Sequence, residues 1–163
     1  MDLARADQIG ADAVSRLRPY CRRIEIAGSV RRRCPYPGDI EIVCIREMAR
    51  LQDFHDVIES WRRVRGDARG KYTQRIHTTG EKLDIFMVDK YNWGFQFAIR
   101  TGSAGFSKNC LAAKWVQLGY HGEGGYLREG REIGAGKIIA LPEEMDLFDL
   151  LKIPFVKPEF RTI

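Results

Sequence analysis

Asp39 and Glu41 stand two residues apart in a segment, residues 39–45, whose alternation of polar and apolar side chains predicts a β-strand. Side chains two apart on a strand leave the same face, so both carboxylates lie side by side. Two such carboxylates repel each other, and a bound divalent cation removes the repulsion. Asp84, within a second strand pattern at residues 82–88, adds a third carboxylate if the two strands are neighbours.

Three converging carboxylates can hold two metal ions about 4 Å apart. One ion lowers the pKa of an attacking hydroxyl group, and the other neutralises a leaving phosphate. Magnesium suits a set of oxygen ligands, and manganese can substitute for it. From the spacing alone, a sheet edge that carries solvated acidic residues is an equal alternative.

A possible phosphate site precedes these carboxylates in the sequence. Gly28 and Ser29 predict a turn between a strand at residues 23–27 and a short helix that starts at Val30 and is capped by Ser29. Such a turn presents backbone N–H groups to an anion, and arginines 31–33 follow it with side chains that bind phosphate in a bidentate manner. A phosphate-binding turn beside a metal-binding carboxylate pair is what nucleotidyl transfer requires. For Gly28 alone, the alternative is an ordinary turn.

Length and charge set limits on the class of protein. The 163 residues, 44% of them hydrophobic, fit one domain or two small ones and are enough to bury a core. The formal net charge is +5, and arginines gather at residues 22–33 and 62–69. A basic surface of this kind favours a polyanionic partner such as nucleic acid.

Other classes are not favoured by the sequence. No apolar run approaches the ~20 residues needed to span a bilayer, so we expect no membrane association. The start of the chain lacks the apolar stretch of a signal peptide, and we expect a cytoplasmic protein. The four cysteines form no CxxC pair, so reduced thiols are expected rather than a zinc site or a disulfide framework.

The predicted elements define an α+β fold. In the first half they are a helix at 2–17, strands at 23–27 and 39–45, a helix at 51–64, and a hairpin of strands at 72–77 and 82–88. In the second half they are a helix at 103–118, short hairpins within 122–136 and a helix from 142 to 151. We expect a mixed or antiparallel sheet with the three carboxylates on one face and the helices 2–17 and 51–64 on the other.

Three segments together resemble a known family. Residues 28–32, Gly-Ser-Val-Arg-Arg, followed by residues 38–42, Gly-Asp-Ile-Glu-Ile, resemble the nucleotidyltransferase signature of the family X DNA polymerases, the group of polymerase β and terminal transferase. Thr101-Gly102-Ser103 with Phe106, Lys108 and Asn109 resembles that family's Thr-Gly-Ser turn and the helix behind it. Residues 144–149 with Pro158 resemble its C-terminal segment. The first motif marks the wider superfamily, whereas the three together are more specific.

The resemblance implies roles for the matching positions. Asp39, Glu41 and Asp84 would bind two magnesium ions and carry catalysis, with Asp84 nearest the primer 3′-hydroxyl. Positions expected to bind the nucleotide are Gly28, Ser29, Arg32, Thr101, Gly102 and Ser103. The last three would line the sugar, with a cis peptide bond between Gly102 and Ser103. Lys82 would touch primer phosphate, and Lys108 would lie near the templating base.

The resemblance also implies an activity and an organisation. The chain is similar to a reduced palm-plus-thumb form, with a nucleotidyltransferase palm at residues 1–95 and a small α/β thumb at 96–163. Such a DNA polymerase adds nucleotides from nucleoside triphosphates to a DNA 3′-hydroxyl, in gap filling or end repair. Its partners would be the primer end of gapped or nicked DNA and a nucleoside triphosphate, and we expect a monomer. The alternatives are a minimal nucleotidyltransferase with a non-DNA substrate and a catalytically decayed DNA-end-binding module.

The sequence departs from the family pattern at three places. Glu41 stands where the family usually has Asp. Ile99 and Arg100 replace a pair of aromatic residues before the Thr-Gly-Ser turn, and Ser107 and Leu111 replace polar residues that probe the minor groove. Since selection requires groups that reject the wrong substrate, we expect weak sugar selection and low fidelity.

Overall fold

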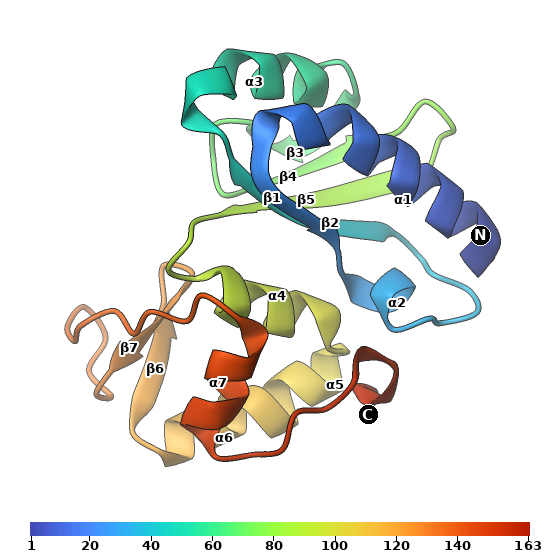
Figure 1. Cartoon of the computed structure of the whole chain (residues 1–163). Coiled ribbons are helices and arrows are strands. Elements are labelled where there is room, and N and C mark those ends of the chain that lie inside the picture. The colour runs from blue at the N-terminus through green and yellow to red at the C-terminus, as the bar shows by residue number, and fades with distance from the viewer. The chain divides into compact units, whose positions relative to one another are not determined.

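The computed structural model describes all 163 residues, and the chain forms two compact units, Met1–Asp89 and Lys90–Ile163 (Figure 1). The boundary between the units precedes the one predicted at residues 95 and 96. Helix α4, Trp93–Thr101, explains the difference, because it packs against α7, Glu144–Leu151, inside the second unit. None of the helices has the length and apolar character that crossing a bilayer would demand.

The first unit is built on a five-stranded mixed sheet. Its strands, in spatial order, are β1 Cys21–Ile26, β2 Ile40–Arg46, β5 Lys82–Val88, β4 Tyr72–Ile76 and β3 Arg62–Gly66. The central strands β2 and β5 are parallel, and the other neighbours are antiparallel. This arrangement confirms the predicted mixed sheet and makes the two carboxylate-bearing strands direct neighbours.

Two helices cover one face of this sheet. They are α1, Leu3–Leu17, and α3, Leu51–Glu59, which lie on the same side of the strands in Figure 1. Short helical segments join the elements: η1 Arg18–Tyr20, α2 Gly28–Arg31 and η2 Met48–Arg50. Helix α1 begins after Asp2, whose carboxylate accepts a hydrogen bond from the backbone N–H of Arg5 at 2.8 Å.

The alternation along β2 separates the core from the carboxylates. Ile40, Ile42 and Cys44 are fully buried and pack with α1 and α3 in one hydrophobic core, together with Leu83 and Ile85 of β5. The residues between them, Glu41 on β2 and Asp84 on β5, therefore lie on the opposite face. The prediction that the helices and the carboxylates occupy opposite faces is confirmed.

One predicted helix is too long. The helix expected over residues 51–64 ends at Glu59, and Arg62–Gly66 form β3, the outermost strand of the sheet. Strand β3 has exposed side chains at Arg62 to Arg65, so its sequence lacks the alternation that marks a half-buried strand. It forms because β4, ten residues further along the chain, provides its hydrogen-bond partners.

Helices are the main elements of the second unit. After α4 it contains α5 Ala104–Phe106, a π-helical segment η3 Ser107–Ala112, α6 Ala113–Gln117, a hairpin of β6 Tyr120–Glu123 and β7 Tyr126–Glu129, then α7 and η4 Pro158–Phe160. Its own core includes Phe95, Leu111, Leu147 and Phe148. The predicted helix at 103–118 is thus three successive helical segments. Of the short hairpins expected within 122–136, one forms, at residues 120–129, and the last helix begins at Glu144 rather than at 142. All four cysteines of the chain are free thiols.

Candidate active site

Neighbouring strands bring the predicted carboxylates together. Glu41 of β2 and Asp84 of β5 are direct partners in the parallel register. Asp39 stands immediately before β2, and its carboxyl group contacts that of Asp84, with which it can share a hydrogen bond. All three predicted residues therefore lie at one place on the open face of the first unit.

Asp84 is buried, at 7% exposure, and two side chains of β4 hold it. The hydroxyl of Tyr72 donates a hydrogen bond to Oδ1 of Asp84, and Nε2 of Gln74 donates to the same oxygen at 2.9 Å. Gln74 is also the register partner of Asp84 across the antiparallel β4–β5 pair. Neither residue was predicted from the sequence, although their two-residue spacing within a predicted strand was a signal that they share a face.

Tyr72 acts as a hydrogen-bond donor over the whole physiological range. Burial and the neighbouring Asp84 carboxylate raise the pKa of Tyr72 to about 12, since both disfavour a phenolate. Its ring stacks on Phe86 of β5, with centroids 5.0 Å apart and ring planes at 28°. The ring contact fixes the direction in which the hydroxyl points.

Asp39 is in an environment that disfavours its charge. Burial raises the pKa of the Asp39 carboxyl, and the adjacent Asp84 raises it further, whereas Lys82 and Arg32 lower it. Two carboxyl groups in contact must either hold a proton between them or be neutralised by a cation. The oxygen-only donor set fits a hard divalent ion such as magnesium.

The three carboxylates do not form a complete metal-binding group in this structure. No three His, Cys, Asp or Glu side chains lie in an arrangement that could hold a metal ion. The Glu41 carboxylate lies against Gly28, where a Cβ added to the glycine would be 2.0 Å from Oε2. A metal site at Asp39, Glu41 and Asp84 therefore remains a prediction.

Gly28 begins α2 with a backbone φ of +61°, in the left-handed region that favours glycine. The residue that caps α2 is Ala27, so the prediction that Ser29 caps a helix starting at Val30 is wrong. The helix starts earlier because Gly28 itself turns the chain. Ser29 is half-buried in its first turn, and its role toward a phosphate stays a prediction.

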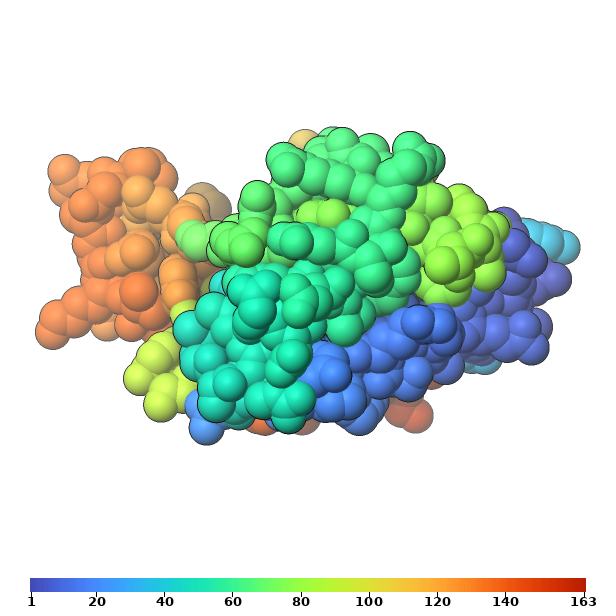
Figure 2. All heavy atoms as spheres, turned by 90° about the horizontal axis from the view of Figure 1, so that it is seen from above, coloured from blue at the N-terminus to red at the C-terminus, as the bar shows by residue number.

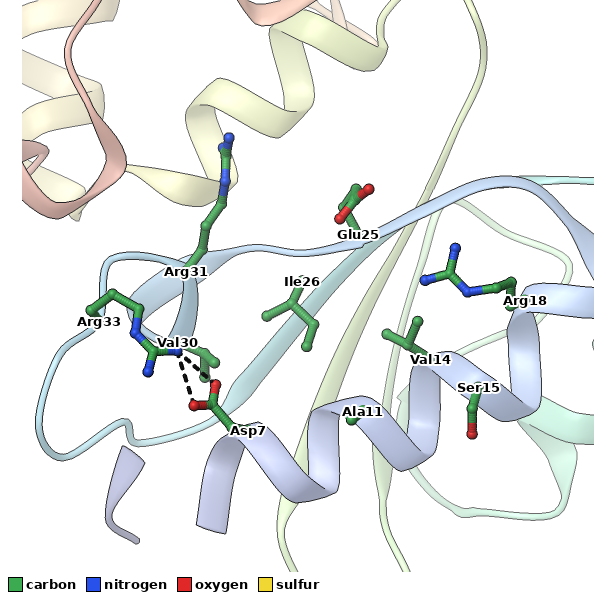
Figure 3. Close-up of a pocket in the computed structure, with 10 residues that line it drawn as sticks. All are labelled: Asp7, Ala11, Val14, Ser15, Arg18, Glu25, Ile26, Val30, Arg31 and Arg33. Atoms are coloured by element: carbon green, nitrogen blue, oxygen red, sulfur yellow. Dashed lines mark hydrogen bonds and ion pairs between the residues drawn. The ribbon is translucent and has the colours of Figure 1, made fainter. Parts of the chain in front are cut away.

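The three arginines after this turn lie in different surroundings. Arg33 is bound by Asp7, with both carboxylate oxygens 2.9 Å from Nη1, and Arg31 leaves α2 in another direction (Figure 3). Both line a pocket of about 520 Å³ between α1, β1 and α2. Arg32 is the one that acts electrostatically on Asp39. The structure therefore favours Arg32 among the three as a neighbour of the carboxylates.

The other residues that were predicted to bind nucleotide or DNA lie on β5 in the first unit and on α4, α5 and η3 in the second. Lys82 is exposed at the start of β5. Thr101 is buried at the end of α4, Gly102 follows it, and Lys108 is exposed in η3. The chain contains no cis peptide bond, so the cis bond expected between Gly102 and Ser103 is a wrong prediction. Ser103 instead caps α5, its Oγ accepting from the N–H of Phe106 at 3.1 Å.

The fold is similar to that of a DNA polymerase of known structure. Polymerase β of Leishmania infantum, determined as a ternary P/T complex, matches with a TM-score of 0.74 over 99% of this chain and 76% of that chain, at 19% sequence identity. No protein-family model and no curated protein sequence matches the chain. At this identity the likeness establishes the fold alone. It is polymerase β-like, as the motifs of the sequence predicted.

Proposed function

We propose that this chain is a nucleotidyltransferase that adds nucleotides from nucleoside triphosphates to the 3′-hydroxyl of a DNA primer. The observation that carries the proposal is the carboxylate cluster. Glu41 and Asp84 are paired on adjacent parallel strands, and Asp39 contacts Asp84. In a polymerase β-like fold, such a cluster supports phosphoryl-transfer chemistry.

In this proposal the carboxylates bind metal ions, and two neighbouring side chains position one of the carboxylates. Asp39, Glu41 and Asp84 would hold two magnesium ions. Bound divalent ions supply positive charge that activates a hydroxyl and neutralises a leaving pyrophosphate. Tyr72 and Gln74 orient Asp84 through their hydrogen bonds, and are positioning residues rather than ligands.

Two observations favour DNA as the acceptor. The structural neighbour, a polymerase β, was determined with primer and template. The chain itself carries 27 Lys and Arg against 22 Asp and Glu, and a positive net charge attracts nucleic-acid phosphates. Gap filling or end repair is the setting that we propose for this activity, with a monomer as the acting species.

The test is a primer-extension experiment with labelled nucleoside triphosphate. A primer is offered free, annealed to a template, and within a gapped duplex, with magnesium, with manganese and with a chelator. The proposal expects extension that requires a divalent ion and is lost in Asp84→Asn. Asp149→Asn is the matched control, because Asp149 is an exposed carboxylate on α7 without hydrogen bonds to its side chain, and it should extend like the wild type.

Two results would count against the proposal. If no primer is extended while label appears on RNA, protein or a small molecule, the chain is a nucleotidyltransferase of another substrate class. If labelled triphosphate neither transfers nor binds with any metal, the carboxylate cluster is not a catalytic site.

A further inference from the structure

A second polar pocket lies at the outer edge of the sheet in the first unit. Its volume is about 510 Å³. It lies between the end of α3, the start of β3 and the neighbouring strand β4. Its lining residues are Glu59, Ser60, Trp61, Arg62, Arg63, Asp67 and Arg75. Figure 2 views the molecule from the side of α3, and the segments from α3 to β4, turquoise to green, are exposed in that view.

This pocket lies on the opposite face of the sheet from Asp84. Gln74, which binds Asp84, precedes Arg75 on β4, so Arg75 projects from the other face. Arg75 is in register with Leu83, whose side chain belongs to the core under α1 and α3. The pocket is therefore separate from the carboxylate cluster.

Arg75 is a buried cation without a carboxylate partner. Only 5% of it is exposed. Its Nε donates a hydrogen bond to Oγ1 of Thr73 at 2.9 Å, and its Nη1 donates to the carbonyl of Trp61 at 3.3 Å. Neutral acceptors hold the guanidinium in place, and the carboxylates of Glu59 and Asp67 act on it electrostatically without forming an ion pair with it. A buried charge without a directly bound counter-charge is unfavourable.

Two further arginines increase the positive charge of the pocket. Arg63 is the direct partner of Arg75 across the β3–β4 pair, and like charges in that position repel each other. Arg62 and Arg63 are both exposed and make neither a hydrogen bond nor an ion pair through their side chains. Three guanidinium groups thus face one space without a bound carboxylate.

The acidic residues of the lining make their direct contacts with Arg69. At longer range Glu59 and Asp67 attract Arg75, and Asp67 attracts Arg63. Oε1 of Glu59 lies 3.0 Å from Nη1 of Arg69, and Oδ1 of Asp67 lies 3.9 Å from the same nitrogen. Oδ1 of Asp67 also accepts a hydrogen bond from the backbone N–H of Arg69 at 2.9 Å. Because Arg69 binds both carboxylates, neither forms an ion pair with Arg62, Arg63 or Arg75.

We propose that this pocket binds a phosphate group through Arg62, Arg63 and Arg75. Arginine offers planar pairs of N–H donors that match phosphate oxygens, and an anion between Arg63 and Arg75 replaces their repulsion with attraction. The phosphate belongs either to a nucleic-acid backbone or to a free phosphoanion. The site does not depend on nucleotidyl transfer, since it is made of other residues on the other face of the sheet.

Binding is measured by NMR titration of the ¹⁵N-labelled chain with inorganic phosphate at constant ionic strength, following the arginine Nε–Hε signals. We expect a saturable shift of the Arg75 signal. Arg63→Gln should weaken phosphate binding about tenfold, the loss expected for one charge-assisted contact. Arg22→Gln is the matched control, because Arg22 is an exposed arginine on β1, the opposite edge of the same sheet, and its removal changes the net charge equally.

Either of two results overturns the proposal: the Arg75 signal does not saturate, or Arg22→Gln and Arg63→Gln weaken binding equally. Arg75→Met should abolish the site. If that variant does not fold, Arg62→Gln and Arg63→Gln decide the question, because both side chains are exposed and their loss leaves the core intact.

Fluorescence anisotropy distinguishes a nucleic-acid phosphate from a free phosphoanion. It is measured with labelled single-stranded and duplex DNA, without nucleotide or divalent metal. If Arg63→Gln weakens DNA binding by the same factor as phosphate binding, the ligand is a strand backbone. If it weakens only phosphate binding, the ligand is a free phosphoanion. Both results support the site, and neither depends on catalytic activity.

Discussion

The hydroxyl of Tyr72 is the smallest group whose removal tests how Asp84 is positioned. In Tyr72→Phe the ring keeps its stacking on Phe86, but Asp84 loses the hydrogen bond from the hydroxyl and retains the one from Gln74. A hydrogen bond to a charged group is worth about 1.5–3 kcal/mol, so we expect the rate of transfer to fall at least about tenfold. The KM for the triphosphate should change little, and the melting temperature should fall by a few degrees, since the hydrogen bond also stabilises the fold.

The measurement is kcat and KM for primer extension, with a thermal melt of each variant. Tyr36→Phe is the control, because Tyr36 is an exposed tyrosine in the loop before Asp39, at 80% exposure. A Tyr72→Phe variant with the wild-type kcat would show that Tyr72 does not position Asp84 for the reaction.

Gly28 gives a second residue-scale prediction. In Gly28→Ala the new Cβ meets Oε2 of Glu41 at 2.0 Å, and φ is +61°. The left-handed conformation costs a residue with a Cβ about 1–2 kcal/mol, and the Glu41 carboxylate must move. We expect urea unfolding to show a loss of about that size and transfer to fall about tenfold or more.

Gly38→Ala is the matched control, since its Cβ meets nothing within 4 Å and its φ is not in the left-handed region. Equal effects of the two substitutions on unfolding and transfer would contradict the role given to Gly28.

At the scale of elements, a contact between α1 and the β4–β5 connection predicts a pH dependence. Oδ2 of Asp12 on α1 lies 2.6 Å from Nε2 of His77, which follows β4. That hydrogen bond is the main reason why the pKa of Asp12 is below its ordinary value of 3.8. A lowered carboxyl pKa contributes stability above the unfolded-state pKa, and this stability is lost as pH falls through the folded-state value.

Asp12→Asn should therefore be less stable than the wild type near neutral pH. The difference between them should shrink as pH falls below about 4, where the unfolded-state carboxyl takes up its proton. Urea midpoints measured at several pH values test this, with Asp149→Asn as an exposed control. A difference between Asp12→Asn and wild type that stays constant with pH would show that the Asp12–His77 contact does not lower the pKa of Asp12.

The elements also explain which parts of the fold the sequence could predict. β2 and β5 were predictable because each alternates between the core and the open face, with Ile42 and Ile85 inside and Glu41 and Asp84 outside. Helix α4 was missed because it is buried on nearly all sides, including Phe95, Gln96 and Phe97 in succession, so no apolar stripe marks it.

The candidate site was predictable to the same extent. The strand spacing identified the three carboxylates, Asp39, Glu41 and Asp84. They lie close together only because β2 and β5 are neighbours in the sheet, and the sequences of the separate strands do not reveal that pairing. Tyr72 and Gln74 bind Asp84 only because β4 is antiparallel to β5 in one register, and the register is set by tertiary pairing.

At the scale of the whole molecule, the proposed binding to DNA predicts a dependence on salt. With a formal net charge of +5, the chain should hold DNA mainly through lysine and arginine contacts to phosphate. Such contacts release counterions, so affinity falls steeply with salt. We expect the dissociation constant for a gapped duplex to rise about a hundredfold between about 50 and 200 mM salt, as several phosphate contacts imply.

Fluorescence anisotropy across that salt range measures the slope of log Kd against log salt concentration. An equal dissociation constant at both ends of the salt range would mean that contacts to phosphate charges do not dominate DNA binding.

The proposed function depends above all on Asp84 taking part in the chemical step of nucleotide transfer. The decisive measurement is the single-turnover rate of primer extension on a gapped duplex for wild type and Asp84→Asn, with triphosphate affinity measured in parallel. We expect extension by Asp84→Asn to be abolished while triphosphate binding is largely retained, because the lost carboxylate acts on the reaction rather than on ground-state binding. Wild-type turnover in Asp84→Asn would show that Asp84 has no part in the chemistry.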